Sequence, residues 1–170
     1  RDFFALSAAA KGKYKWVSPE SNRGYLSMGQ ESADSLVSDL KETFEIGNEA
    51  EARFPNLWPR VELPHFREAT LAYFRVADAL HLDVLRGIAI GMGMDEEYFT
   101  PLCDGNHQNL RLLHYPRHPR VQLSAEGRKR IGAHTDYGSI TLLVQDGVGG
   151  LEARRRDGSW VPVPPVPGGV

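Results

Sequence analysis

Residues 132–146 read Gly132-Ala133-His134-Thr135-Asp136-Tyr137-Gly138-Ser139-Ile140-Thr141-Leu142-Leu143-Val144-Gln145-Asp146, and this stretch decides the expected fold and site. Its second half is apolar and β-branched, without Pro or Gly, which predicts a strand over residues 140–145. In an extended segment, residues two apart point to the same side. The imidazole of His134 and the carboxylate of Asp136 are therefore expected to face one point.

A nitrogen and an oxygen donor together suit a borderline divalent metal, and two histidines with one carboxylate are the usual ligands of non-haem iron oxygenases. The alternative for a His-x-Asp tripeptide is a surface turn beside an N-capping Asp. The residues downstream bear on this choice: Gln145-Asp146, then Gly149-Gly150-Leu151, then Trp160-Val161-Pro162-Val163-Pro164.

With these flanks, the motif resembles the iron- and 2-oxoglutarate-dependent dioxygenases of the isopenicillin N synthase-like group. The resemblance implies Fe(II) held by His134, Asp136 and a distal histidine, with 2-oxoglutarate as cosubstrate. It also implies that O₂ is used to hydroxylate, desaturate or otherwise oxidise a small molecule, with release of succinate and CO₂. The fold implied is a double-stranded β-helix, or jelly roll, within an α+β chain whose N-terminal part is helical.

The same resemblance suggests cosubstrate contacts. Tyr115 precedes Pro116, where the family often has a tyrosine that donates its hydroxyl to 2-oxoglutarate. Arg111 shares a strand face with Tyr115 and offers a cation. Barrel packing for Tyr115 and a salt bridge for Arg111 are the structural alternatives.

Part of the expected site is missing from the sequence. The family's distal histidine, and an Arg-x-Ser pair that grips 2-oxoglutarate, follow the carboxylate by some fifty residues, whereas 34 residues follow Asp136 and none is His. We therefore expect a piece truncated at both ends and inactive by itself. Two other functions stay open: an Fe(II) oxidase of the same fold that does not use 2-oxoglutarate, and a non-catalytic binding domain.

Composition limits the partners and the location. The 170 residues carry a net charge of −2, which does not suggest a nucleic-acid surface. Cys103 is the single cysteine, which favours a reducing compartment, and we expect a cytoplasmic protein. No apolar run approaches the roughly 20 residues of a membrane span.

Periodicity predicts a long helix over residues 65–93, with one face formed by Ala69, Tyr73, Val76, Leu80, Val84 and Ile88. Helical character before residue 103 and strands after it suggest two regions, 1–103 and 104–170. Short helices are expected after Ser7 and after Asp95. The predicted strands are Lys41–Gly47, Leu110–Tyr115 and a hairpin about Asp157-Gly158, with a loop at 117–127. Leu112, Leu142 and Val144 are expected to be core or pocket-lining residues.

Overall fold

The structure is a computed structural model that describes residues 1–18, 20–31, 38–103, 105, 107–117 and 130–170. The predicted loop at 117–127 lies, apart from Arg117, outside these residues. The chain divides into two compact units, Arg1–Thr135 and Asp136–Val170.

The first unit begins with two short helices, α1 (Asp2–Ala5) and α2 (Ala8–Gly12). Ser7 caps α2 as predicted, because its hydroxyl oxygen accepts a hydrogen bond of 3.2 Å from the Ala10 amide. The strands β1 (Gly24–Leu26), β2 (Glu42–Gly47) and β3 (Asn109–His114) then form an antiparallel sheet with β2 in the middle. These positions confirm the strands predicted over Lys41–Gly47 and Leu110–Tyr115.

One face of this sheet carries the core. Phe44 is fully buried on β2, and its ring centroid lies 4.4 Å from that of Phe3. Tyr25 and Ile46 complete the buried cluster, and Leu112, opposite Phe44 in the register, packs against it as expected. The other face presents Thr43 and Glu45 from β2 beside Leu113 and Arg111 from β3.

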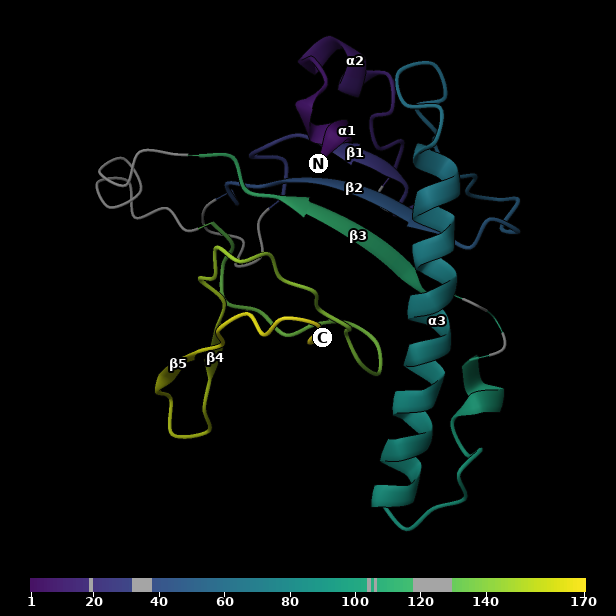
Figure 1. The fold of residues 1–170 in the computed structure, drawn as a ribbon, viewed down its shortest axis with the longest axis vertical. Coiled ribbons are helices and arrows are strands. Elements are labelled where there is room, and N and C mark those ends of the chain that lie inside the picture. The colour runs from purple at the N-terminus through teal and green to yellow at the C-terminus, as the bar shows by residue number, and fades with distance from the viewer. Residues whose placement is uncertain (19, 32–37, 104, 106, 118–129) are drawn as a thin grey trace. The chain divides into compact units, whose positions relative to one another are not determined.

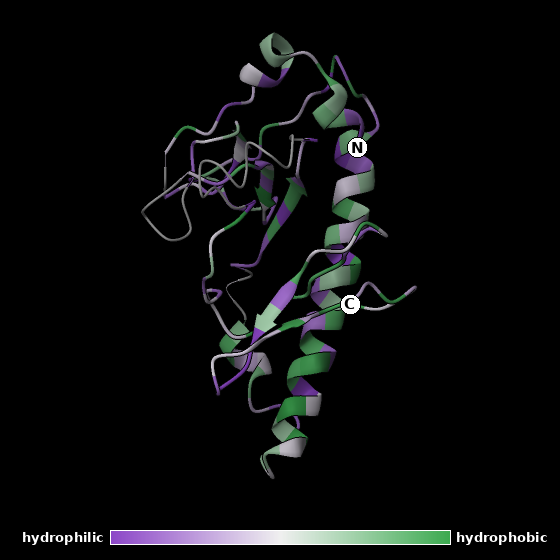
Figure 2. Cartoon of the chain, turned by 90° about the vertical axis from the view of Figure 1, so that its left-hand side faces the viewer, coloured by the Kyte–Doolittle hydropathy of each residue, from purple (hydrophilic) through white to green (hydrophobic). Residues whose placement is uncertain are grey.

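Helix α3 (Phe66–Gly91) confirms the predicted long helix, and Gly93, with φ of 70°, follows its end. The helix meets the core through its beginning, where Phe66, Leu71 and Phe74 pack on the buried cluster. It then continues beyond the sheet, and apolar segments recur along its whole length (Figures 1 and 2).

The predicted apolar face of α3 is not its most buried face. Thr70, Leu85 and Ala89 are buried, whereas Tyr73 and Val76 are 46% and 68% exposed. At the beginning of the helix the core contacts Phe66, Leu71 and Phe74, which lie off the predicted face, a choice that periodicity alone does not determine. No helix in the described part of the chain is both long enough and apolar enough to span a membrane.

The helix predicted after Asp95 is wrong. Asp95 accepts a hydrogen bond of 2.9 Å from the Glu97 amide in a turn, and the only helical turn nearby in the described segment is the 3-10 helix η1 (Thr100–Cys103). An Asp side chain bonded to a nearby amide favours a turn as readily as a helix cap.

The second unit holds the predicted hairpin, with β4 (Glu152–Arg154) paired to β5 (Trp160–Pro162) and Gly158 at φ of 88°. The strand predicted over residues 140–145 is wrong, because this segment has no regular structure and no ladder partner among the described residues. Leu142 is half-buried, but Val144 is 57% exposed, against expectation. Helices and antiparallel strands thus occur together as predicted, while the jelly roll stays a prediction.

Candidate metal centre

His134 lies near the end of the first unit, in a segment without regular secondary structure. Its Nδ1 is 2.9 Å from the carbonyl oxygen of Gly132, a buried residue. A carbonyl oxygen only accepts, so Nδ1 must be the donor in this hydrogen bond. The bond therefore selects the tautomer of the neutral ring that carries its proton on Nδ1.

Asp136 is the first residue of the second unit and is exposed. His134 thus belongs to the first unit and Asp136 to the second. In the described ranges, no three His, Cys, Asp or Glu side chains gather as a group able to hold a metal. This finding is compatible with the sequence, which supplies two of the three ligands that the resemblance implies.

Gly132 is held in place by Asp39, a residue to which the sequence pattern gave no role. The Asp39 Oδ1 accepts a hydrogen bond of 3.1 Å from the Gly132 amide across 93 positions of the chain. Asp39 is 2% exposed, and its Oδ2 lies 2.9 Å from the ammonium of Lys41. A buried ion pair thus contacts the backbone two residues before His134.

Arg111 lies on β3, on the sheet face opposite the aromatic core, and forms two ion pairs. Its guanidinium is 2.8 Å from Glu45 Oε1 and 3.0 Å from Glu31 Oε1. Asn109 donates a hydrogen bond of 2.7 Å to the other oxygen of Glu45. Burial raises the pKa of Glu45, although Arg111 and Asn109 act in the opposite direction. The salt-bridge alternative for Arg111 is therefore present in the structure.

Tyr115 directly follows β3 and has the strand parity of Arg111. Burial raises the pKa of its phenol, the negative charges of Asp39 and Glu31 raise it further, and Arg111 opposes them. The hydroxyl therefore keeps its proton at neutral pH and is available as a hydrogen-bond donor. Asp39, whose charge raises the pKa of Tyr115, is also the residue that accepts the hydrogen bond of the Gly132 amide.

His114 belongs to a different environment, the core-side face of the sheet. Its Nδ1 is 2.7 Å from Glu42 Oε1, and its ring stacks on Phe4 at a centroid distance of 5.1 Å. Burial alone raises the pKa of Glu42, but hydrogen bonds from Lys11, Tyr25 and His114 together lower it. These contacts agree with leaving His114 out of the ligand set.

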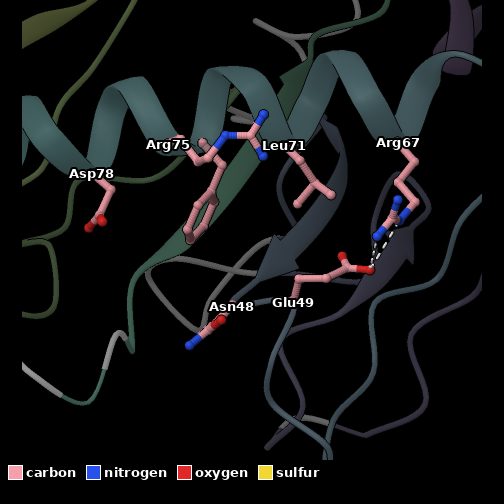
Figure 3. A pocket seen from close by; sticks show the side chains of 7 residues that line it. Asn48, Glu49, Arg67, Leu71, Arg75 and Asp78 are labelled. Atoms are coloured by element: carbon pink, nitrogen blue, oxygen red, sulfur yellow. Dashed lines mark hydrogen bonds and ion pairs between the residues drawn. The ribbon is translucent and has the colours of Figure 1, made fainter.

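A pocket of about 370 Å³ opens beside the beginning of α3 in the described part of the molecule (Figure 3). The ion pair between Arg67 and Glu49, at 2.9 Å, lies at one end of it. Its lining residues are Asn48, Glu49, Arg67, Leu71, Phe74, Arg75 and Asp78. None of the predicted ligands or cosubstrate contacts is among them, so this pocket is not the candidate metal centre.

The chain matches two family models. Residues 106–170 match the 2OG-Fe(II) oxygenase superfamily, and residues 1–61 match the N-terminal region of non-haem dioxygenases in morphine synthesis. Proline hydroxylase buaE of Petromyces alliaceus is 40% identical over 172 residues, which cover 96% of this chain and 54% of that protein.

Solved structures agree with these matches. A full-length Neurospora crassa protein in complex with alpha-KG, which is 2-oxoglutarate, gives a TM-score of 0.88 at 41% identity, over 96% of this chain and 53% of that one. JOX2 in complex with 2OG, Fe and JA gives a TM-score of 0.76 at 26% identity, over 97% and 48%.

The chain belongs to the 2OG-Fe(II) oxygenase superfamily, which confirms the resemblance drawn from the motif. It spans about half the length of the curated relatives and solved structures that it matches.

Proposed function

We propose that this chain forms part of an oxidoreductase that uses Fe(II), O₂ and 2-oxoglutarate to oxidise a small organic molecule. The observation that carries the proposal is the bond between His134 Nδ1 and the Gly132 carbonyl, in a superfamily member whose Gly132 is itself held by buried Asp39. Metal-binding histidines commonly have one ring nitrogen fixed in this way by a backbone carbonyl.

His134 and Asp136 would hold the metal, His134 through Nε2 because its Nδ1 donates to Gly132. One imidazole and one carboxylate are the donor types that suit ferrous iron, and the third ligand would be a histidine outside these 170 residues. Bound iron would supply O₂ activation, coupled to conversion of 2-oxoglutarate to succinate and CO₂, for hydroxylation or desaturation of the substrate. The protein's own task is to orient these donors and the substrate.

Tyr115 would donate its phenolic hydrogen to a carboxylate oxygen of 2-oxoglutarate. Its raised pKa supports this role, because the donor persists through neutral and mildly alkaline pH. Arg111 would contact the cosubstrate only by exchanging Glu31 or Glu45 for the incoming carboxylate. Exchange of Glu31 is the less costly change, since Glu45 is fully buried and its unpaired charge would be expensive.

We also propose a jelly-roll core that begins within 104–170, an N-terminal region over 1–103, and a cytoplasmic location. The substrate is a small molecule, as in the Neurospora crassa protein, which was also solved in complex with alpha-KG and thymine.

The test is cosubstrate turnover by the full polypeptide that carries these residues. We expect succinate to form from 2-oxoglutarate only with added Fe(II) and O₂, and Asp136→Ala to abolish it. A matched change at Asp146, an exposed carboxylate of the same unit, should leave turnover intact. Turnover of O₂ without 2-oxoglutarate would favour the oxidase, and iron-independent behaviour would refute the proposal.

A further inference from the structure

Asp39 and Lys41 form a buried ion pair that the proposed chemistry does not use. Asp39 Oδ2 is 2.9 Å from Lys41 Nζ, and the two side chains are 2% and 4% exposed. The pair lies just before β2 (Glu42–Gly47), the central strand of the sheet. Burying two charges to this degree costs desolvation free energy, so the other contacts of the pair indicate what it does in the fold.

Its remaining contacts lead to the segment that carries His134. Asp39 Oδ1 accepts the Gly132 amide at 3.1 Å, and the next residue, Leu40, donates its amide to the Arg130 carbonyl at 3.1 Å. Asp39 and Leu40 thus bind Gly132 and Arg130 of the segment before His134. Because Gly132 is buried, its amide would otherwise lack a partner.

Asp39 is itself fixed by backbone bonds on both sides. Its amide donates to the Glu31 carbonyl at 2.7 Å, and its own carbonyl accepts the Gly29 amide at 3.2 Å. Glu31 also lies 3.3 Å from Lys41, and Arg111 lies 3.0 Å from Glu31. Each carboxylate of this group therefore has a cation beside it.

Gly132 links Asp39 to His134. The Gly132 amide donates a hydrogen bond to Asp39 Oδ1, and the Gly132 carbonyl accepts one of 2.9 Å from His134 Nδ1. The position of Asp39 therefore sets the position of the carbonyl that selects the tautomer and direction of the imidazole.

We propose that Asp39, supported by Lys41, is a positioning residue for the metal-binding loop, which it orients through Gly132 and thereby through His134. This inference rests on the proposed function, because it takes His134 as a metal ligand. Its structural part, that Asp39 holds Gly132, does not depend on metal.

The variants separate positioning from simple folding. Asp39→Ala removes the acceptor of the Gly132 amide. Asp39→Asn keeps an amide oxygen there and removes only the carboxylate charge that faces Lys41, which still has Glu31 at 3.3 Å as its counter-ion. Lys11→Met is the matched control, because Lys11 also forms a buried ion pair in the same unit, with Glu42 at 2.7 Å. The contacts of Lys11 are Glu42, the Phe4 carbonyl and the Tyr25 ring, on the other side of the sheet.

The first measurement is amide exchange of Gly132 in the metal-free full polypeptide. Asp39→Ala should speed exchange at Gly132 roughly ten-fold more than at core amides of β2, because a charge-assisted hydrogen bond is lost locally. Asp39→Asn should restore most of the protection. Lys11→Met should change Gly132 no more than the core amides.

The second measurement is anaerobic Fe(II) affinity, read from the visible band of the iron–2-oxoglutarate chelate. Asp39→Ala should weaken Fe(II) binding about ten-fold, with recovery in Asp39→Asn and no specific loss in Lys11→Met. Unchanged Gly132 exchange, or faster exchange with unchanged Fe(II) affinity, would overturn the positioning role. Failure of the unaltered protein to bind Fe(II) would instead refute the proposed function.

Discussion

Two lysine–glutamate pairs of equal length give a sharp test of how burial determines stability in the first unit. Lys11–Glu42 and Lys13–Glu62 are both 2.7 Å long, but Lys11 is 10% exposed and Lys13 is 63% exposed. The perturbation is Lys11→Met, with Lys13→Met as its control. Each change removes one ammonium group and keeps a side chain of similar length to lysine. The two changed positions are two residues apart.

The expected magnitude follows from what remains around Glu42. After Lys11→Met, the carboxylate keeps the hydroxyl of Tyr25 at 2.5 Å and the ring of His114 at 2.7 Å. Loss of the third, charged donor should therefore cost about 2 kcal/mol, below the full penalty for an isolated buried charge. Lys13→Met should cost far less, because water replaces an exposed ammonium.

The same change should alter the pH dependence. The lowered pKa of Glu42 means that its stabilising contribution is present above the unfolded pKa and is lost as pH falls through the folded pKa. Without Lys11 the folded pKa rises, so acid unfolding should begin at a higher pH than in the unaltered protein.

The assay is urea unfolding of the full polypeptide at pH 7 and at stepwise lower pH, followed by tryptophan fluorescence. Trp58 packs against the core cluster and should report on this unit. Equal losses for Lys11→Met and Lys13→Met, or an unchanged acid limb for Lys11→Met, would show that burial does not make the Lys11 pair the stronger one.

Three further changes test the sheet and the cosubstrate contact. Gly24→Ala should cost about 2 kcal/mol in urea unfolding, because φ is +100° and a Cβ would lie 2.5 Å from the Tyr14 carbonyl oxygen; Gly87→Ala, with open space in α3, should be neutral or stabilising. Phe44→Ala should cost about 4 kcal/mol, and a loss below that of Gly24→Ala would contradict the assigned core. Tyr115→Phe should raise the KM for 2-oxoglutarate roughly ten-fold without changing Fe(II) affinity, and an unchanged KM would remove that contact.

Local sequence signals predicted the elements whose structure depends on few distant contacts. The spacing of apolar residues in 65–93 located α3, and Asp157-Gly158 located the hairpin, where Gly158 adopts the positive φ that such a turn needs. Ser7 predicted the start of α2 for the same reason, since its hydroxyl bonds an amide three residues away.

Strands β2 and β3 were located although they pair with each other across a long stretch of chain, but other features that depend on distant partners were predicted less well. Ile140 to Val144 has strand composition, but a strand forms only against another strand, and none pairs with it among the described residues. Which stripe of α3 is buried depends on what packs against the helix. The spacing of the helix's own apolar residues does not determine this.

The candidate site shows the same division. The His-x-Asp spacing identified His134 and Asp136 as candidate ligands, and Tyr115 and Arg111 as candidate contacts followed from the family resemblance and strand parity. Asp39 was missed because its partner, Gly132, is 93 positions away. The one available signal was an acidic residue beside Lys41-Glu42 at the entry to a strand that proves wholly buried.

We propose that His134 and Asp136 bind one ferrous ion together with 2-oxoglutarate. Anaerobic titration of the full polypeptide with Fe(II) and 2-oxoglutarate tests this binding, because the chelate has a visible charge-transfer band. We predict a band in the unaltered protein and in His114→Gln, and its loss in His134→Ala, in Asp136→Ala and in the 170 residues alone. A band that survives His134→Ala and Asp136→Ala, or one that the isolated chain forms unaided, would show that these two residues do not hold the iron as proposed.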